Sequence, residues 1–178
     1  MNETEHIILN KVANSSLVTL DLEDLYPKGE RVLYDLKENL FMDIILKEKD
    51  FREFIKTNDW SQYQNKFVAI TCSEDVIIPT WAYMLLSTKL QPFASKIVFG
   101  DLEILESNLF DEAINKINIE EFRDVRVVVK GCSKVPVPAS AYVHITNLLM
   151  PVAQSIMFGE PCSTVPLYKR PKNKNEIN

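Results

Sequence analysis

The sequence contains little glycine, with 4 in 178 residues, and little histidine, with 2. Loops that cradle phosphates, such as the Walker loop and the GxGxxG turn, need closely spaced glycines because the backbone must approach the phosphate oxygens. Neither motif occurs in the chain, and no serine, histidine and aspartate occur in that order along it. The sequence therefore argues against a phosphate-cradling loop and offers no complete catalytic triad.

Long apolar runs and clusters of positive charge are also missing. No run approaches the roughly eighteen apolar residues that span a bilayer, and MNETEHIILNKV has neither the basic start nor the long apolar stretch of a secretion signal. The net charge is −5, and lysine and arginine are scattered among the acids. Only residues 169–178 are basic, and we expect a disordered tail there. We expect a cytoplasmic protein that binds neither membranes nor nucleic acid.

Cysteine is rare, and each of the three cysteines is followed by serine and then by a nearby proline. Cys72 begins CSEDVIIP, Cys132 begins CSKVP and Cys162 begins CSTVP. An odd number of widely spaced cysteines argues against a disulfide framework and for reduced thiols. The shared Cys-Ser turn makes these thiols the first candidates for chemistry.

The apolar residues predict an α/β fold. Runs rich in β-branched residues predict short buried strands. They are LVTLDL near Leu17, MDIIL near Met42, FVAIT at Phe67, KIVF at Lys96 and VRVVV at Val125. Helical spacing predicts one helix through Val32, Leu33, Leu36 and Leu40, and another through Leu102, Leu105, Leu109 and Ala113 with Asp101 as its N-cap. This alternation predicts a single α/β domain over residues 1–168, with a mostly parallel sheet flanked by helices.

Two segments of the chain resemble each other. Residues 66–101 and 126–160 each contain a strand, a Cys-Ser loop, a proline-opened helix and a second short strand. The match needs one residue gapped in the loop, and it predicts an internal strand-loop-helix-strand repeat. The aligned pairs include Cys72 with Cys132, Pro79 with Pro138, Tyr83 with Tyr142, and Gly100 with Gly159.

The repeated loop lies where α/β proteins bind ligands, at the carboxyl ends of the strands. Cys72 and Cys132 both fall there, before a helix whose unpaired first amides would lower the pKa of a nearby thiol. The alternative interpretation is that each cysteine is a small hydrophobic residue buried in the core, without a chemical role. His144, in the apolar helical stretch AYVHITNLLM, is either a core residue or the base that activates Cys132. Cys132 and His144 are therefore the candidate catalytic pair.

A metal site is the other chemistry that thiols suggest. Three thiolates with a fourth ligand would hold zinc, and three alone would hold an iron–sulfur cluster with one open position. No C-x-x-C or H-x-x-x-H spacing supports this directly. The support is the expected placement of Cys72, Cys132 and Cys162 at one edge of the sheet, which makes them the candidate metal ligands.

Four stretches of the sequence are distinctive: LDLEDLYPKGERVLYDLK, TWAYMLLSTKLQP, EEFRDVRVVVKGC and FGEPCSTVPLYK. Through them the chain resembles an uncharacterised bacterial family of unknown function, family 2480, from about Leu17 to Lys172. The resemblance implies no established activity, cofactor or catalytic residue. The family's genes tend to lie near iron–sulfur assembly genes, which implies iron–sulfur assembly proteins as partners and favours the thiol-metal interpretation.

Two classes of function remain open. The first is a non-catalytic binding or assembly protein, forming a homo-oligomer and linked to iron–sulfur or thiol-metal handling, because apolar residues are plentiful and no catalytic constellation is complete. The alternative is a thiol-dependent enzyme with a cysteine nucleophile at a helix N-terminus. Reactive thiols with a lowered pKa would favour the enzyme.

Overall fold

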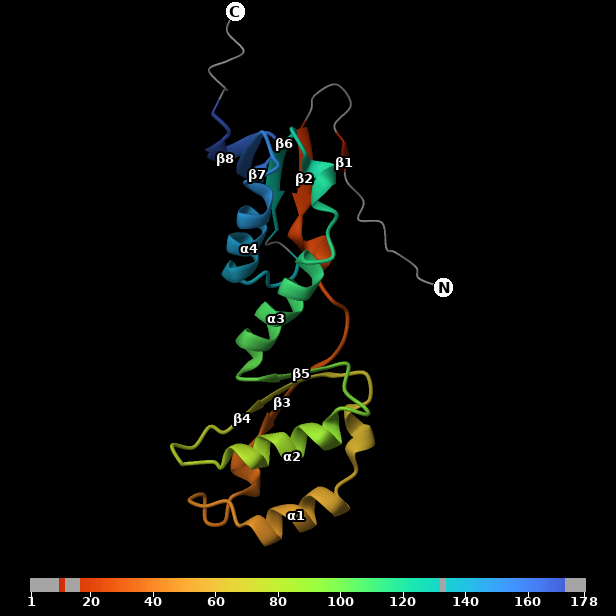
Figure 1. Ribbon diagram of the computed structural model, residues 1–178, viewed down its shortest axis with the longest axis vertical. Helices are drawn as coiled ribbons and strands as arrows, with labels where there is room; N and C mark the ends of the chain where they lie inside the picture. The colour runs from red at the N-terminus through yellow and green to blue at the C-terminus, as the bar shows by residue number, and fades with distance from the viewer. Residues whose placement is uncertain (1–9, 12–16, 132–133, 172–178) are drawn as a thin grey trace, which may run out of the picture. The chain divides into compact units, whose positions relative to one another are not determined.

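The computed structural model describes residues 10–11, 17–131 and 134–171 (Figure 1). The chain divides into two compact units, each with its own sheet and core. Lys28–Asn108 form one of them, here called the inserted unit, and Met1–Pro27 with Leu109–Asn178 form the other, here called the split unit. No helix in the described ranges is long and apolar enough to cross a bilayer.

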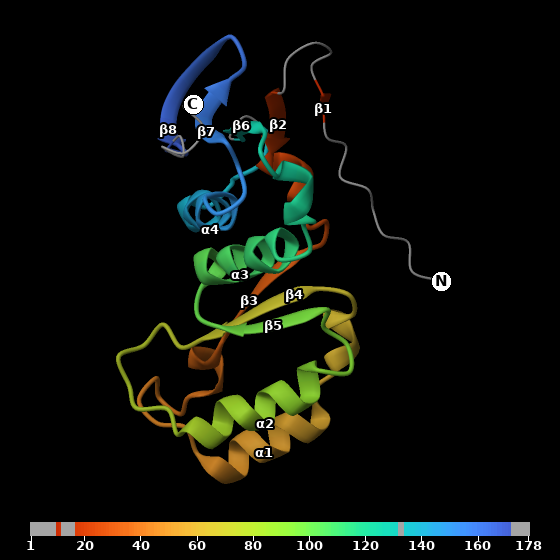
Figure 2. The same ribbon diagram turned by 45° about the horizontal axis from the view of Figure 1, so that its top comes forward.

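The inserted unit is a three-stranded parallel sheet with helices on it. Its sheet has the order β3-β4-β5, and Figure 2 shows α1 and α2 side by side on one face of these strands. Central strand β4 is buried on both faces, as is usual in parallel sheets. The elements are β3 (Arg31–Asp35), the 3-10 helix η2 (Leu36–Asn39), α1 (Glu48–Thr57), η3 (Trp60–Tyr63), β4 (Phe67–Thr71), α2 (Thr80–Leu90) and β5 (Lys96–Phe99).

Apolar side chains at helical and strand spacing build the core of the inserted unit. Phe51 and Ile55 lie one turn apart on α1 and are both buried, so α1 presents an apolar face to the sheet. The other members of the core are Tyr34, Leu36, Leu46, Trp60, Val68, Ile70, Ala82, Leu86 and Leu90.

A five-stranded mixed sheet forms the split unit, with the order β1-β2-β6-β7-β8. Strands β2, β6 and β7 are parallel, whereas β1 and β8 pair antiparallel at the two edges. The elements are β1 (Asn10–Lys11), β2 (Leu17–Asp21), η1 (Leu22–Leu25), η4 (Ile119–Phe122), β6 (Arg126–Lys130), α4 (Ala139–Leu149), β7 (Ser155–Glu160) and β8 (Ser163–Lys169). Helix α3 (Leu102–Ile114) contains the boundary between the units and contributes Phe110 and Ile114 to this core.

The α/β class is confirmed, and so are most of the predicted elements. Four of the five predicted strands are present as β2, β4, β5 and β6. The helix predicted from Leu102 is α3, and the Asp101 carboxylate accepts a hydrogen bond from the Ile104 amide at 2.8 Å. The parallel pairing is also present, but the strands are divided between two sheets.

Two predicted elements are wrong. The helix expected through Val32 and Leu40 is strand β3 followed by η2, because Arg31–Asp35 pairs in parallel with β4. In place of the strand expected at MDIIL, residues 41–45 form an exposed turn, which Phe41 closes by donating its amide to the carbonyl of Ile45 at 2.8 Å, and only Leu46 of MDIIL is buried. In both places the tertiary pairing decides the conformation, and the local apolar pattern does not.

The two segments of the predicted repeat have the same order of strand, helix and strand. Their elements begin at Phe67 and Arg126, at Thr80 and Ala139, and at Lys96 and Ser155, so each pair is 59 residues apart. The spacing is uniform, which leaves no room for a gap in the loop and puts Gly131 opposite Cys72. Cys132 lies outside the described residues, so its alignment with Cys72 and the duplication itself stay predictions.

We expect Tyr34 to make the stability of the inserted unit sensitive to alkaline pH. Burial raises the pKa of Tyr34, and the neighbouring Tyr63 adds to this. Tyr34 also donates a hydrogen bond to Asn39 Oδ1 at 2.8 Å, which only the protonated phenol can make. A phenol with a raised pKa in the folded state stabilises the fold below its unfolded pKa of about 10, and this contribution is lost as the pH rises further.

We therefore expect the free energy of unfolding to fall above pH 10 by up to about 1.4 kcal/mol per pH unit for this group. The Tyr34→Phe variant should fall less steeply and should be about 1 kcal/mol less stable at neutral pH, where it lacks the hydrogen bond to Asn39. Urea titrations from pH 8 to 11 measure both effects. Equal slopes in the two proteins would show that Tyr34 is not the titrating group.

Candidate functional site

The carboxyl-end edge of the inserted sheet gathers polar side chains, as expected for a parallel sheet. Strand β3 ends at Asp35, whose carboxylate accepts hydrogen bonds from the amides of Lys37 at 2.9 Å and Ser73 at 3.0 Å. Cys72 follows the last residue of the neighbouring strand β4. The sequence placed Cys72 at this edge correctly but gave no role to Asp35.

Asp35 carries a fixed negative charge at this edge. Burial would raise its pKa, but the hydrogen bonds from the Ser73 side chain and from the backbone of Lys37 and Ser73 outweigh burial and hold the pKa below its ordinary value. Burial raises the pKa of Tyr83, and the nearby Cys72 and Asp35 raise it further. The edge therefore offers an ionised carboxylate beside a phenol that keeps its proton.

Cys72 is half-buried against the core of the inserted unit. Its Sγ lies 3.8 Å from the carbonyl oxygen of Glu74, to which the thiol donates a weak hydrogen bond. The Glu74 side chain is held by Lys37, with 2.6 Å between Oε1 and Nζ. The thiol thus lies near the Glu74 carbonyl and the Tyr83 phenol, and no histidine that could activate it as a nucleophile is among these neighbours.

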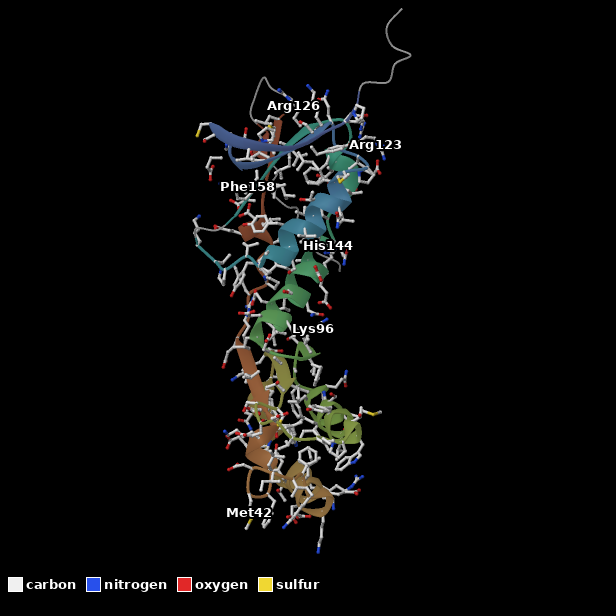
Figure 3. All side chains as sticks on the ribbon, turned by 90° about the vertical axis from the view of Figure 1, so that its left-hand side faces the viewer. Met42, Lys96, Arg123, Arg126, His144 and Phe158 are labelled. Atoms are coloured by element: carbon white, nitrogen blue, oxygen red, sulfur yellow. The ribbon has the colours of Figure 1, made fainter. Side chains whose placement is uncertain are left out.

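His144 on α4 is paired with a carboxylate. Its Nδ1 lies 2.7 Å from Oδ1 of Asp111 on α3, and the side chain is 25% exposed. Figure 3 shows His144 on the surface of its helix. The histidine is therefore accessible from solvent and oriented by an acid. Its predicted partner Cys132 lies outside the described residues, so the Cys132 and His144 pair stays a prediction.

The three candidate metal ligands are spread over both units. Cys72 belongs to the inserted unit, Cys162 is exposed between β7 and β8 of the split unit, and Cys132 lies outside the described residues. Among the residues that the structure describes, no three His, Cys, Asp or Glu side chains are grouped to hold a metal ion. A shared zinc or iron–sulfur site therefore stays a prediction.

The corresponding edge of the split unit carries an ion-paired lysine. Lys130 at the end of β6 places Nζ 3.2 Å from Asp21 Oδ2 and 3.6 Å from Glu160 Oε1. The hydrogen bond and the attraction of Asp21, followed by Glu160, raise the pKa of Lys130. The phenol of Tyr142 donates to the carbonyl of Gly131, the residue that corresponds to Cys72. Among the residues that the structure describes, the inserted edge therefore has the Cys72 thiol where the split edge has Gly131, and Lys130 pairs with two carboxylates at the split edge.

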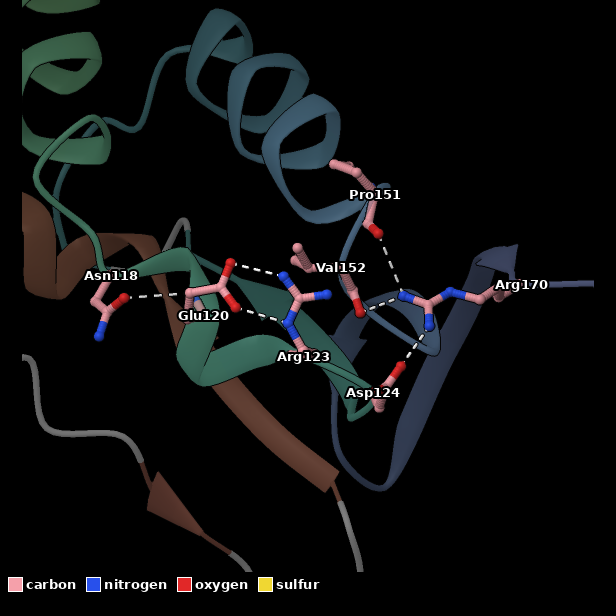
Figure 4. A network of polar contacts seen from close by, with 7 residues as sticks. All are labelled: Asn118, Glu120, Arg123, Asp124, Pro151, Val152 and Arg170. Carbon is pink, nitrogen blue, oxygen red and sulfur yellow. Dashed lines mark hydrogen bonds and ion pairs between the residues drawn. The ribbon is translucent and has the colours of Figure 1, made fainter.

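The opposite edge of the split sheet holds a structural network (Figure 4). Arg170, just after β8, binds the Asp124 carboxylate and the Val152 carbonyl, and Arg123 binds Glu120 with 2.6 Å between Nε and Oε2. These contacts join β8 to the loops that lead into β6 and β7. The network holds edge strand β8 in place, and its charged groups pair with one another.

The exposed turn at residues 41–45, here called the apolar turn, is a feature that the sequence did not predict. Its four large apolar side chains are exposed, with Phe41 at 42%, Met42 at 73%, Ile44 at 69% and Ile45 at 55%. Figure 3 shows Met42 pointing away from the inserted unit. Met42 and Asp43 both have positive φ, at 52° and 56°, a conformation that non-glycine side chains adopt at a cost. The chain thus holds apolar side chains in water on a strained turn.

A pocket of about 230 Å³ lies next to the apolar turn and shares Phe41 with it. Aromatic and aliphatic side chains form its wall, and three charged side chains line it. The lining consists of Glu38, Asn39, Leu40, Phe41, Lys47, Asp50, Phe51 and Phe54. Surfaces of this composition, apolar with a few polar groups, are the kind that proteins use for binding.

Comparison with known proteins identifies a family. Residues 6–170 match the sequence profile of a family described as protein of unknown function (DUF2480). No curated protein and no solved structure matches the chain. The match includes both units, and so it includes both sheet edges and the apolar turn.

Proposed function

We propose that this chain, which belongs to the DUF2480 family of proteins of unknown function, is a non-catalytic binding or assembly protein of the cytoplasm that associates with itself. The apolar turn carries the proposal. Exposed apolar surface costs free energy in water, and its burial against a partner recovers roughly 25 cal/mol per Å². A strained turn that presents Met42, Ile44 and Ile45 to solvent is explained by a partner surface that covers it.

The polar groups of the sheet edges support binding over catalysis. Lys37 is paired with Glu74, and Lys130 with Asp21 and Glu160, so these charges satisfy one another. Catalytic groups usually face a substrate site with their pKa values shifted toward the working pH. Here the raised pKa of Lys130 and the lowered pKa of Asp35 move away from neutrality, which keeps both groups ionised.

Light scattering over a dilution series tests the proposal. The chain has a mass of 20.5 kDa, and we expect a weight-average mass of at least twice this value at high concentration, falling toward the monomer on dilution. A strict monomer at every concentration would contradict self-association.

The link to metal handling rests on the thiols and on the family resemblance. Cys72, Cys132 and Cys162 would hold zinc or an iron–sulfur cluster, and iron–sulfur assembly proteins would be the partners. Metal analysis of protein purified without an affinity tag tests this directly. The proposal expects stoichiometric metal that is lost in a Cys162→Ala variant. Substoichiometric metal that the substitution leaves unchanged would rule it out.

A thiol-dependent enzyme is the second candidate, and one observation favours it. His144 and Asp111 are in contact at 2.7 Å. An activated cysteine requires a base and a group that orients the base, and His144 and Asp111 would fill these two roles. Cys132 would be the nucleophile. Iodoacetamide labelling against pH distinguishes the two functions, because an activated thiol reacts well below the usual pKa of about 8.5. If Cys132 is labelled only near or above that pH, the hypothesis of a thiol-dependent enzyme is wrong.

A further inference from the structure

The pocket beside the apolar turn carries negative charge that nothing in the described part of the chain neutralises directly. The carboxylates of Glu38 and Asp50 line the pocket, and neither makes an ion pair or hydrogen bond with any residue that the structure describes. Lys47 is the only positively charged side chain in the lining. Two carboxylates and one ammonium leave the lining with a net charge of −1.

The aromatic wall of the same pocket is already in contact with a cation. Lys47 Nζ lies 3.0 Å from the centroid of the Phe41 ring. Aromatic faces attract ammonium and guanidinium groups through the negative potential above the ring. The position of Lys47 therefore shows that this wall accommodates a positive charge.

We propose that the pocket receives a lysine or arginine side chain of the polypeptide that covers the apolar turn. This inference rests on the proposed function, in which that polypeptide is a second copy of the chain. The charged head of such a side chain would pair with Glu38 and Asp50. Its aliphatic stem would pack on Leu40 and Phe54, since long basic side chains bury their stems on apolar surface.

The charge of the pocket argues against two other occupants. An anionic lipid surface is repelled by unpaired carboxylates and attracted by clustered lysines, and the lining has only one lysine. A purely apolar segment would fill the volume but would leave Glu38 and Asp50 beside it without partners, which costs free energy on desolvation. A basic side chain would pair with the carboxylates through its charged head and would pack on the apolar wall through its aliphatic stem.

A matched pair of small probes tests the site on the intact protein. N-acetyl-arginine amide carries the guanidinium, and N-acetyl-citrulline amide has nearly the same shape without the charge. We expect the arginine probe to shift the amide signals of residues 38–54 in ¹H–¹⁵N spectra, with a dissociation constant on the order of millimolar. The citrulline probe, at matched ionic strength, should shift them much less. Equal shifts, or none with either probe, would overturn the inference.

Substitutions at the pocket should change the affinity in opposite directions. The double variant Glu38→Gln with Asp50→Asn should weaken arginine binding by roughly fivefold or more, because it removes both carboxylates. Lys47→Met should strengthen binding by about twofold, because it removes a like charge and a competitor for the Phe41 face. A purely structural role of these residues would not produce opposite signs.

Two other acids on α1 provide the matched control. Glu48 and Glu53 are exposed and pair with Arg52 and Lys56, and neither lines the pocket. The Glu48→Gln with Glu53→Gln variant removes the same net charge and should change arginine affinity by less than about twofold. An effect as large as that of the pocket variant would mean that only the overall charge matters, and the inference would fail.

The inference and the proposed function fail separately. If the arginine probe binds while light scattering finds a monomer at every concentration, the pocket stands and self-association is wrong. If the chain self-associates but neither probe binds, the pocket inference is wrong and the proposed function stands.

Discussion

Replacing Met42 and Ile44 by serine is expected to raise the dissociation constant of self-association by about thirtyfold or more. Both side chains are largely exposed on the apolar turn, and each would lose roughly 1 kcal/mol or more of burial against the partner. The fold should be unaffected, because neither side chain contributes to the core. Light scattering measures the association, and urea titration followed by tryptophan fluorescence measures the stability.

Val165 and Leu167 on β8 provide the matched control. Both are more than half exposed, and they belong to the split unit. The Val165→Ser with Leu167→Ser variant removes a comparable amount of exposed apolar surface and should leave the dissociation constant within about twofold of the original. If this variant weakens association as strongly as the turn variant does, association depends on general apolar surface and the assignment to the turn is wrong.

Replacing Phe51 by alanine is expected to lower the stability of the inserted unit by about 3 to 5 kcal/mol. Phe51 is 1% exposed, it belongs to the core of this unit, and its ring packs 6.1 Å from that of Trp81. The truncation would leave a cavity that the surrounding sheet and helices fill only in part. Phe51 also lines the pocket, so the truncation should weaken arginine binding as well.

Tryptophan fluorescence isolates this effect, since the chain has two tryptophans and both lie in the inserted unit. The matched control is Phe122→Ala, which removes a ring that is equally buried in the core of the split unit. It should shift the unfolding transition seen by circular dichroism and shift the tryptophan transition much less. Equal shifts of the tryptophan transition in the two variants would show that the two cores unfold as one.

The sequence predicted the central strands well because their apolar residues are continuous. Residues 68–70 of FVAIT and 127–129 of VRVVV are buried in the structure, as runs of β-branched residues usually are in parallel sheets. Helix α3 was also predictable, since its leucines repeat at helical spacing after the Asp101 cap. These elements were recoverable because their local pattern agrees with their tertiary surroundings.

The apolar turn was not recoverable from its composition. MDIIL has the same β-branched, apolar character as the buried strands, so the pattern predicted burial. The hydrogen bonds between Phe41 and Ile45, together with left-handed backbone at Met42 and Asp43, turn the chain back on itself. Methionine carries no signal for such a backbone, because glycine, asparagine and aspartate are the residues that usually adopt it.

The candidate site was predictable in part. The end of β4 placed Cys72 at the sheet edge, but no sequence pattern indicated that Asp35 accepts a hydrogen bond across the edge from Ser73. One signal was present, since Asp21 and Asp35 each end a strand and precede leucine, and each caps a 3-10 turn. No sequence pattern indicated that Glu38 and Asp50 would line one pocket, because their proximity depends on how η2 and α1 pack together.

Oxidation of methionine by hydrogen peroxide tests the binding role of the apolar turn most directly. Met42 and Met84 are similarly exposed in the inserted unit, at 73% and 66%, so Met84 serves as an internal reference in the same sample. We expect Met42 to oxidise several times more slowly as protein concentration rises through the association range, while the rate at Met84 stays constant. A rate at Met42 that is independent of concentration, in a sample that light scattering shows to be associated, would contradict this expectation.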